Sequence, residues 1–201
     1  MGSDIRHIHL ATGNAHKAQE FQALANAAHL GLKILPAASM PAVVEDTGTF
    51  TGNARKKAAA LKAILPADAW VLADDSGLCV AALAGAPGVE SAYFAGPHGD
   101  PRANLRKLVE VMANVPDDRR GAYFVCVLCL QGPNGVAQVV EERCPGRLAR
   151  EPSGGNGFGY DPLFVPDGYV QTYAELDESA KNQLSHRGRA FAQLARWLSG
   201  L

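Results

Sequence analysis

Two adjacent carboxylates, Asp74 and Asp75, lie at the end of the apolar run Trp70–Ala73 and are followed by Ser76 and Gly77. The run predicts a buried strand that ends at the glycine, at the sheet edge where α/β folds place their sites. Side chains alternate along a strand, so only one carboxylate is expected to face a given pocket. Neighbouring carboxylates repel unless a cation lies between them, which favours a site for a hard ion such as Mg²⁺. A solvated turn is the alternative, because these residues are also good turn formers.

A polar turn links a predicted strand over residues 5–11 to a predicted helix with Phe21 and Leu24 on its buried face. The turn comprises Thr12, Gly13, Asn14, Ala15, His16 and Lys17. Backbone N–H groups at a helix start favour a phosphate, and Lys17 adds a positive charge. The spacing matches neither a Walker A loop nor the dinucleotide-binding glycine pattern. A lysine on an exposed helix is the alternative.

A second predicted helix follows residue 49, with Thr49 or Thr51 as its cap. Asn53 and Lys57 are four residues apart, so both lie on one face of this helix and could point together into a cleft. Exposed lysine is again the alternative.

The stretch 153–162 is too rich in glycine for a helix or strand. Such a loop lets backbone groups approach a flat ligand, and Phe158 offers a stacking face. A flexible linker is the alternative, but linkers rarely contain aromatic residues. The sequence therefore favours a ligand-binding loop.

The last helix is predicted to begin at Ser185, with His186, Arg187 and Arg189 in its first turns. Cations are unfavourable at a helix N-terminus, so their presence suggests an anionic or carbonyl-bearing ligand. A short acidic helix is predicted before it, over residues 174–181.

Other patterns indicate scaffold. Asp100 and Pro101 predict the cap and first residue of a helix, and strands over 120–131 and 136–142 flank a Gly-Pro-Asn-Gly turn and predict a hairpin. A further strand is expected over 79–83. Cys126 and Cys129 lie three apart in a strand pattern, which places them on opposite faces, so both are expected to be core thiols.

Composition indicates one soluble globular chain with a small partner. The 201 residues carry a net charge of −1, and no basic stripe with interleaved aromatic residues indicates nucleic-acid binding. The sequence contains no apolar run of membrane-spanning length and no signal-peptide core, which predicts a cytoplasmic protein without membrane contact.

Four segments together resemble the inosine triphosphate pyrophosphatase family of non-standard purine nucleotide hydrolases. They are residues 12–17, 73–77, 157–162, and Lys181 with 185–188. The resemblance spans residues 5 to 200. It implies an α/β fold in which an elongated mixed β-sheet is flanked by helices, as a single domain over 1–201 with two lobes and a central nucleotide cleft. It also implies a homodimer and Mg²⁺-dependent cleavage of ITP, dITP or XTP between the α and β phosphates, which would clean the nucleotide pool.

The resemblance also assigns roles to individual residues. Asp75 is implied as general base and metal ligand, and Glu45 as the second metal ligand, with Asp46 as the alternative because the segment around them is one residue shorter than the common form. The implied substrate-binding residues are Thr12, Gly13, Asn14, Ala15, His16, Lys17, Lys57 and Ser76 and, around the base, Phe158, Gly159, Tyr160, Asp161, Lys181, His186 and Arg187. Tyr93 stands where the family usually has a basic residue.

Purine specificity would follow from the base edge. Donors from His186, Arg187 or the backbone can pair with O6 of inosine or xanthosine, whereas the amino group of adenine would leave them unpaired, at a cost of roughly 1–3 kcal/mol each. Guanine has the same O6, and the sequence does not show what excludes it. Two rival hypotheses are a nucleotide sensor without catalysis and a related pyrophosphatase for modified pyrimidine or methylated nucleotides.

Overall fold

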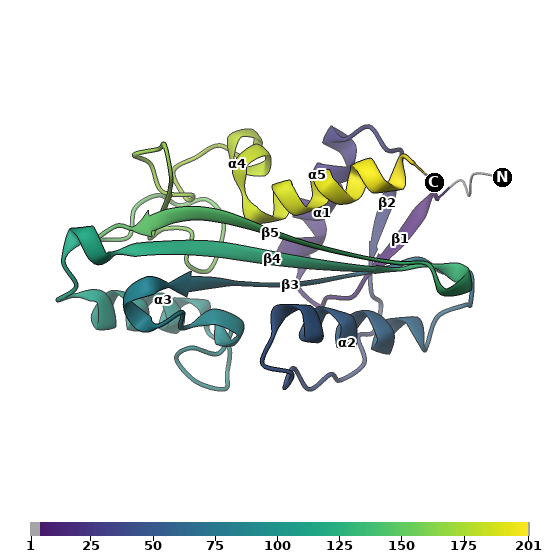
Figure 1. The fold of residues 1–201 in the computed structure, drawn as a ribbon, viewed down its shortest axis with the longest axis horizontal. Coiled ribbons are helices and arrows are strands. Elements are labelled where there is room, and N and C mark those ends of the chain that lie inside the picture. The colour runs from purple at the N-terminus through teal and green to yellow at the C-terminus, as the bar shows by residue number, and fades with distance from the viewer. Residues whose placement is uncertain (1–4, 201) are drawn as a thin grey trace. The chain divides into compact units, whose positions relative to one another are not determined.

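The computed structural model describes residues 5–200, which form a mixed sheet with helices (Figure 1). In chain order the main elements are β1 (His7–Leu10), α1 (Ala15–Ala27), β2 (Lys33–Pro36), α2 (Phe50–Lys62), β3 (Val71–Val80), α3 (Pro101–Met112), β4 (Gly121–Gln131), β5 (Ala137–Leu148), β6 (Phe164–Pro166), α4 (Glu178–Leu184) and α5 (His186–Leu198). The six strands are hydrogen-bonded in the order β2-β1-β3-β4-β5-β6. β1 pairs in parallel with β2 and β3, whereas β5 and β6 are antiparallel. The predicted α/β class with a mixed sheet is confirmed.

The chain divides into two compact units. The first comprises Met1–Asp75, Cys126–Glu142 and Arg187–Leu201, and the second comprises Ser76–Val125 and Arg143–His186. The expectation of a single domain with two lobes stays a prediction.

The first unit is a three-layer arrangement. α1 and α5 cover one face of its strands, and α2 covers the other (Figure 1). On the first face, Phe21 of α1 and Phe191 of α5 pack with Leu72 and Leu128 of the strands. On the second face, small residues of α2 such as Ala54 pack against neighbouring strand residues. Helices on both faces bury β3 and β4 almost completely, which explains the nearly continuous apolar sequences of these two strands.

The second unit has its own core, in which aromatic side chains pack closely. Phe124 of β4 lies 4.8 Å from Phe164 of β6 and 5.7 Å from Tyr173, between ring centroids. Leu108 and Met112 of α3 complete this core. The predicted start of α3 is confirmed, since the Asp100 side chain accepts a hydrogen bond from the backbone N–H of Arg102 and Pro101 is the first helical residue.

The hairpin and the thiols are also confirmed. A short turn over 133–135 joins β4 to β5. Cys126 belongs to the core beneath α1 and α5, whereas Cys129 belongs to the core beneath α2. Both cysteines are buried and free, as the strand alternation predicts.

The boundaries of several elements differ from the predictions. β5 runs six residues beyond the predicted 142, to Leu148. β3 does not end at Gly77 but continues to Val80, so the predicted strand over 79–83 is its last part followed by a 3₁₀ turn over Ala81–Leu83. Burial overrides the turn propensity here, because Asp74 and Asp75 are only 3% and 7% exposed and each is neutralised by a lysine. The solvated-turn alternative is therefore wrong. The acidic helix is α4, which begins four residues later than predicted, at Glu178.

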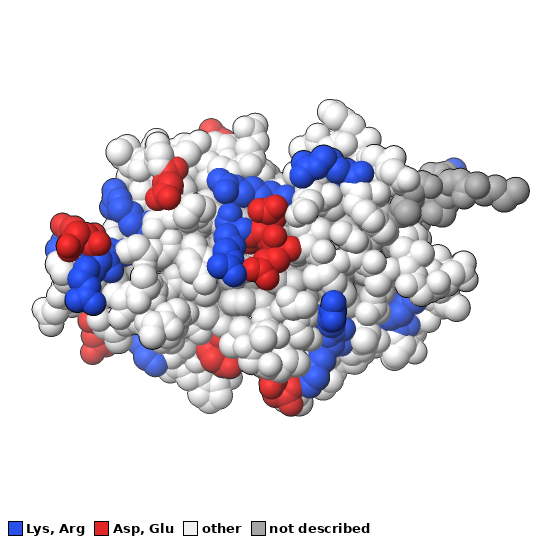
Figure 2. Space-filling view, in the orientation of Figure 1, with Lys and Arg blue, Asp and Glu red and all other residues white. Residues whose placement is uncertain are grey.

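The described surface carries charges of both signs. Lys and Arg lie among Asp and Glu on the face drawn in Figure 2, and no continuous basic surface crosses it. Within residues 5–200, no helix has the length and apolarity needed to cross a membrane.

Candidate active site

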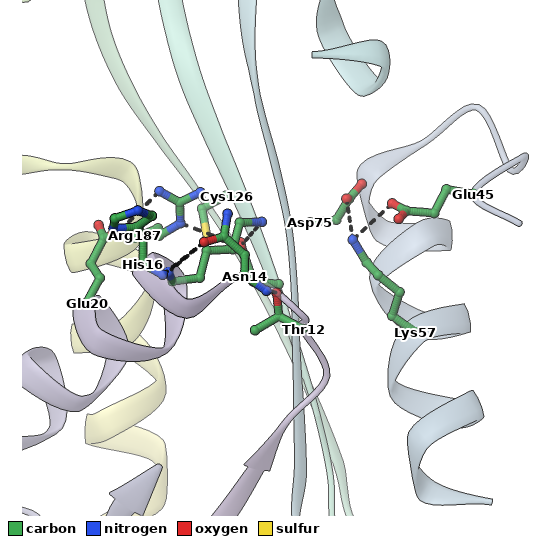
Figure 3. Close-up of polar contacts among 11 residues, drawn as sticks. Thr12, Asn14, His16, Glu20, Glu45, Lys57, Asp75, Cys126 and Arg187 are labelled. Carbon is green, nitrogen blue, oxygen red and sulfur yellow. Dashed lines mark hydrogen bonds and ion pairs between the residues drawn. The ribbon is translucent and has the colours of Figure 1, made fainter. Parts of the chain in front are cut away.

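Asp74 and Asp75 point to opposite faces of β3, as expected for consecutive strand residues. Asp75 lies with Lys57 and Glu45 on the α2 side, whereas Cys126, Arg187 and Glu20 lie on the side of α1 and α5 (Figure 3). The structure therefore places the two carboxylates in different environments within the first unit.

Lys57 joins two of the predicted site carboxylates. Its Nζ lies 2.6 Å from Oδ1 of Asp75 and 3.0 Å from Oε2 of Glu45. Asp46 instead forms an ion pair with Lys56 on the exposed side of α2. This arrangement favours Glu45 over Asp46 as the carboxylate that acts together with Asp75.

Two factors set the protonation of this cluster, namely burial and the excess of carboxylates over the single lysine. Burial raises the pKa of Asp75 to about 6 from an ordinary 3.8, against the lowering effect of Lys57 and with a further contribution from Asp74. Burial alone would lower the pKa of Lys57, but Asp75 and the other carboxylates raise it above its ordinary value. One lysine thus faces more negative charge than it neutralises, which favours an additional cation.

The donor set fits a divalent metal ion. Oδ2 of Asp75 is buried and accepts no hydrogen bond from residues 5–200. The described residues include no cluster of three or more His, Cys, Asp or Glu side chains arranged to hold a metal. Mg²⁺ usually binds through one or two carboxylates together with water and substrate phosphates. Asp75 and Glu45 are sufficient protein ligands for that mode of binding.

The opposite face of β3 carries a network around Asp74 that the sequence did not predict. Oδ2 of Asp74 lies 2.6 Å from Nζ of Lys17 and 3.5 Å from Nε of Arg187. Arg187 also pairs with Glu20 of α1, at 3.3 Å. Burial alone would raise the pKa of Asp74, but Lys17 and Arg187 hold it below its ordinary value. Asp74 therefore remains charged and fixes the predicted phosphate lysine.

The turn before α1 is exposed, and Asn14 within it is the N-cap of the helix. Oδ1 of Asn14 accepts hydrogen bonds from the N–H groups of His16, at 2.9 Å, and Lys17, at 3.4 Å. Thr12 Oγ1 accepts from the N–H of Asn14. Two of the helix N–H groups that the sequence offers to phosphate are thus already used by Asn14. A Cβ added at Gly13 would meet nothing within 4 Å, so the space above the turn is open.

Asn53 does not accompany Lys57 into a site, contrary to the expectation from helical spacing. It is buried, and its Oδ1 accepts hydrogen bonds from the N–H and hydroxyl of Thr47. Thr49 caps α2 through the N–H of Gly52. Asn53 therefore orders the segment that leads from Glu45 to the helix.

The second unit contains most of the residues predicted to bind the base. Oδ2 of Asp161 lies 2.7 Å from Nζ of Lys181 and accepts a hydrogen bond from the N–H of Phe158 at 2.8 Å. Nζ of Lys181 lies 5.6 Å from the centroid of the Phe158 ring. The glycine loop and α4 are thus joined through one buried ion pair.

A hydrogen bond and ring stacking hold two more of the predicted residues of this unit. Tyr160 donates a hydrogen bond to the carbonyl of Ser91, and its burial raises the pKa of the phenol. The ring of His186 stacks on Phe124 at 4.7 Å and 9°. Ser76 is half-buried directly after Asp75 on β3, and Gly159 is half-buried in the loop.

Glu175 helps to order the glycine loop, a role that sequence reasoning missed. Its carboxylate accepts hydrogen bonds from the hydroxyl of Ser153 at 2.5 Å and from the N–H of Thr172 at 2.7 Å. The carbonyl of Ala174 accepts from the N–H groups of Gly155 and Asn156. These contacts tie the glycine loop to the segment before α4, and no local pattern in the sequence signals them.

Comparison with known proteins assigns the chain to a family. The model of the Ham1 family matches residues 8–197. The chain belongs to the Ham1 family. A dITP/XTP pyrophosphatase from Opitutus terrae is 60% identical over 197 residues, which cover 94% of this chain and 97% of that protein. A dITP/XTP pyrophosphatase from Leifsonia xyli is 50% identical over 192 residues, which cover 96% of this chain and 95% of that protein.

Solved structures of Ham1 proteins have the same fold. The Coxiella burnetii HAM1 protein matches with a TM-score of 0.84 at 38% identity, covering 98% of this chain and 100% of that one. The Staphylococcus aureus Ham1 protein matches with a TM-score of 0.82 at 35% identity, and the match covers 97% of this chain and 99% of that one. The predicted resemblance to this family of nucleotide pyrophosphatases is confirmed.

In this Ham1 protein, replacing Gly157 by alanine is expected to disrupt the loop of the second unit. Gly157 has a φ of +74°, and a Cβ there would lie 2.1 Å from Oδ2 of Asp161. We expect about 2–3 kcal/mol of lost stability, of which the backbone conformation alone accounts for about 1–2 kcal/mol. Gly159→Ala is the matched control, because its φ is +64° but a Cβ would meet nothing within 4 Å. Equal free energies of unfolding for the two variants, measured in urea, would contradict this account.

The raised pKa of Asp75 predicts a pH-dependent stability in the metal-free protein. Between about pH 4 and 6 the folded state binds more protons than the unfolded state, so the free energy of unfolding falls as pH rises. The stability advantage of Asp75→Asn over the wild type should therefore grow from near zero at pH 4 to at most about 3 kcal/mol at pH 7.5, measured in urea with EDTA. Asp46→Asn should change in the opposite direction, because Lys56 lowers the pKa of Asp46. A pH-independent difference for Asp75→Asn would refute the assignment.

Proposed function

We propose that this protein hydrolyses dITP, XTP and ITP to the nucleoside monophosphate and pyrophosphate. The observation that carries the proposal is the Asp75 cluster, in which Lys57 and Glu45 flank a carboxylate with one buried oxygen left for a further partner. The named activity of the Opitutus terrae and Leifsonia xyli relatives, at 60% and 50% identity, supports the same substrates.

In this proposal the attack occurs at the α phosphorus. Asp75 orients a water molecule and accepts its proton at Oδ2, and a pKa of about 6 leaves the carboxylate ionised and ready to do so near neutral pH. Lys57 holds Asp75 through Oδ1 and offers positive charge to the phosphates. Lys17, fixed by Asp74, offers a second positive charge at the turn over 12–17. Release of pyrophosphate from a triphosphate corresponds to cleavage between the α and β phosphates.

We further propose that the reaction depends on Mg²⁺ bound by Asp75 and Glu45. The ion would supply neutralisation of the triphosphate charge. The excess of carboxylates over the single Lys57 supports this assignment.

The base is proposed to contact residues of the glycine loop and the His186 segment. Phe158 offers a ring face, and Lys181 lies within reach of that ring while paired with Asp161. His186, stacked on Phe124, is held in one orientation, so it can discriminate O6 from an amino group without first being ordered. Arg187 is proposed to assist in reading O6. A homodimer in the cytoplasm stays part of the proposal.

A nucleotide panel tests the proposed function. ITP, dITP, XTP, dGTP, ATP and dUTP are incubated with and without Mg²⁺, and monophosphate plus pyrophosphate are resolved from diphosphate plus phosphate. We expect Mg²⁺-dependent release of pyrophosphate from the first three and little reaction of dGTP and ATP. Preference for dUTP would indicate a pyrimidine enzyme, and binding without turnover would indicate a sensor; either result refutes the proposal.

A further inference from the structure

A buried cysteine contacts the carboxylate that fixes Lys17. Cys126 of β4 is 0% exposed, and its Sγ donates a hydrogen bond to Oδ1 of Asp74 at 3.3 Å. Figure 3 shows Cys126 beside Arg187 on the α1 and α5 side of β3. The proposed mechanism does not use this thiol.

The two oxygens of Asp74 have different partners. Oδ2 faces Lys17 and Arg187, and Oδ1 faces the thiol of Cys126. A partial rotation of the carboxylate about its Cβ–Cγ bond would move both oxygens away from these partners. A buried carboxylate oxygen that loses its donor is costly, so a donor at Oδ1 fixes the plane of the carboxylate. The position of Lys17 depends on that plane.

A thiol is a suitable donor at this point because it carries no charge. Lys17 and Arg187 already balance Asp74 and Glu20, so another cation at Oδ1 would compete with Lys17 for the carboxylate. Burial, together with the negative charge of Asp74, raises the pKa of the Cys126 thiol well above its ordinary value. The group therefore remains a protonated donor.

Cys129 provides a natural contrast within the same strand. It is also buried, at 2% exposed, but it faces the apolar core beneath α2 with Ala54 and Ala58. Packing is a sufficient reason for a cysteine there. The hydrogen bond to a site carboxylate distinguishes Cys126.

We infer that Cys126 is a positioning residue that orients Asp74 and thereby holds Lys17 ready for the substrate phosphates. The inference rests on the proposed function, because it assigns its effect to phosphate binding by Lys17. It predicts an effect on KM rather than on the chemical step at Asp75.

Kinetics with matched variants test the inference. Cys126→Ala should raise KM for dITP about fivefold to tenfold and leave kcat within about twofold, because a hydrogen bond to a charged group is lost. Cys126→Ser retains a donor and should recover most of the wild-type KM. Cys129→Ala removes another buried thiol of β4 and should change neither constant. An unchanged KM in folded Cys126→Ala, or an equal change in Cys129→Ala, would overturn the inference.

Infrared spectroscopy tests the hydrogen bond without reference to turnover. The S–H stretching band of each thiol is obtained as the difference between the wild type and its serine variant. We expect the band of Cys126 at lower frequency than the band of Cys129, because only Cys126 donates to a carboxylate. Coincident bands would overturn the inference. Absence of turnover in the wild type would refute the proposed function, and the infrared comparison would still decide whether the thiol holds Asp74.

Discussion

Asp75→Asn is expected to lower kcat for dITP by about 10³-fold, because loss of a positioned base typically costs between about 10² and 10⁴. Asparagine has the same shape but cannot accept the proton of the attacking water. Lys57 keeps its contact with Glu45, so the cluster retains one carboxylate and its cation. The affinity for dITP, measured by equilibrium dialysis, should change little.

The matched control is Asp117→Asn. Asp117 is exposed and pairs with Arg150 in the second unit, outside the proposed machinery. It should turn over dITP at the wild-type rate. Near-normal turnover by Asp75→Asn would remove Asp75 from the mechanism.

Lys17→Ala is expected to have the second-largest effect, a rise in KM for dITP of about tenfold to a hundredfold. Charge-assisted contacts to phosphate contribute about 1.5–3 kcal/mol, which corresponds to that range. Lys17 also lies nearer to the buried Asp74 than Arg187 does, at 2.6 Å against 3.5 Å, so its removal weakens the neutralisation of that carboxylate. The variant should therefore unfold at lower temperature as well, and KM is measured below that transition.

Lys56→Ala is the control for this prediction. Lys56 is an exposed lysine of α2 that pairs with Asp46. Its loss should leave KM unchanged, because exposed ion pairs contribute little and it contacts no proposed site residue. An unchanged KM in Lys17→Ala would mean that Lys17 serves only to neutralise Asp74.

The face of an element on which a candidate residue lies was more predictable from the sequence than the contacts of that residue. Strand alternation correctly predicted that Asp74 and Asp75 face opposite sides of β3. Helical spacing identified Lys57 of α2 as a candidate site residue. The same spacing failed for Asn53, whose amide oxygen is used by Thr47. Local patterns specify which face a residue occupies, but the competing partners on that face come from elsewhere in the chain.

Contacts between distant segments could not be predicted in this way. The ion pair of Glu20 with Arg187 joins residues that are 167 positions apart. The thiol of Cys126 reaches Asp74 across neighbouring strands, and a strand pattern predicts only that it is buried. The end of β3 was missed for the same reason, since cations supplied by α1 and α2 make Asp74 and Asp75 acceptable within a buried strand. The turn propensity of residues 74–77 takes no account of those lysines, so it predicted that the strand would end too early.

Two lysines and two carboxylates of the first unit thus form separate pairs across β3. Lys57 and Asp75 lie on the α2 face, where an oxygen remains available for chemistry. Lys17 and Asp74 lie on the other face, where Cys126 and Arg187 also contact the carboxylate. We expect the first pair to determine kcat and the second to determine KM.

The most direct test is hydrolysis of dITP in ¹⁸O-labelled water with Mg²⁺, followed by mass spectrometry of both products. Attack of water at the α phosphorus, with Asp75 as its base, predicts label in dIMP and none in pyrophosphate. Label in pyrophosphate, or formation of dIDP and phosphate, would show that water attacks another phosphorus and would contradict the proposed mechanism.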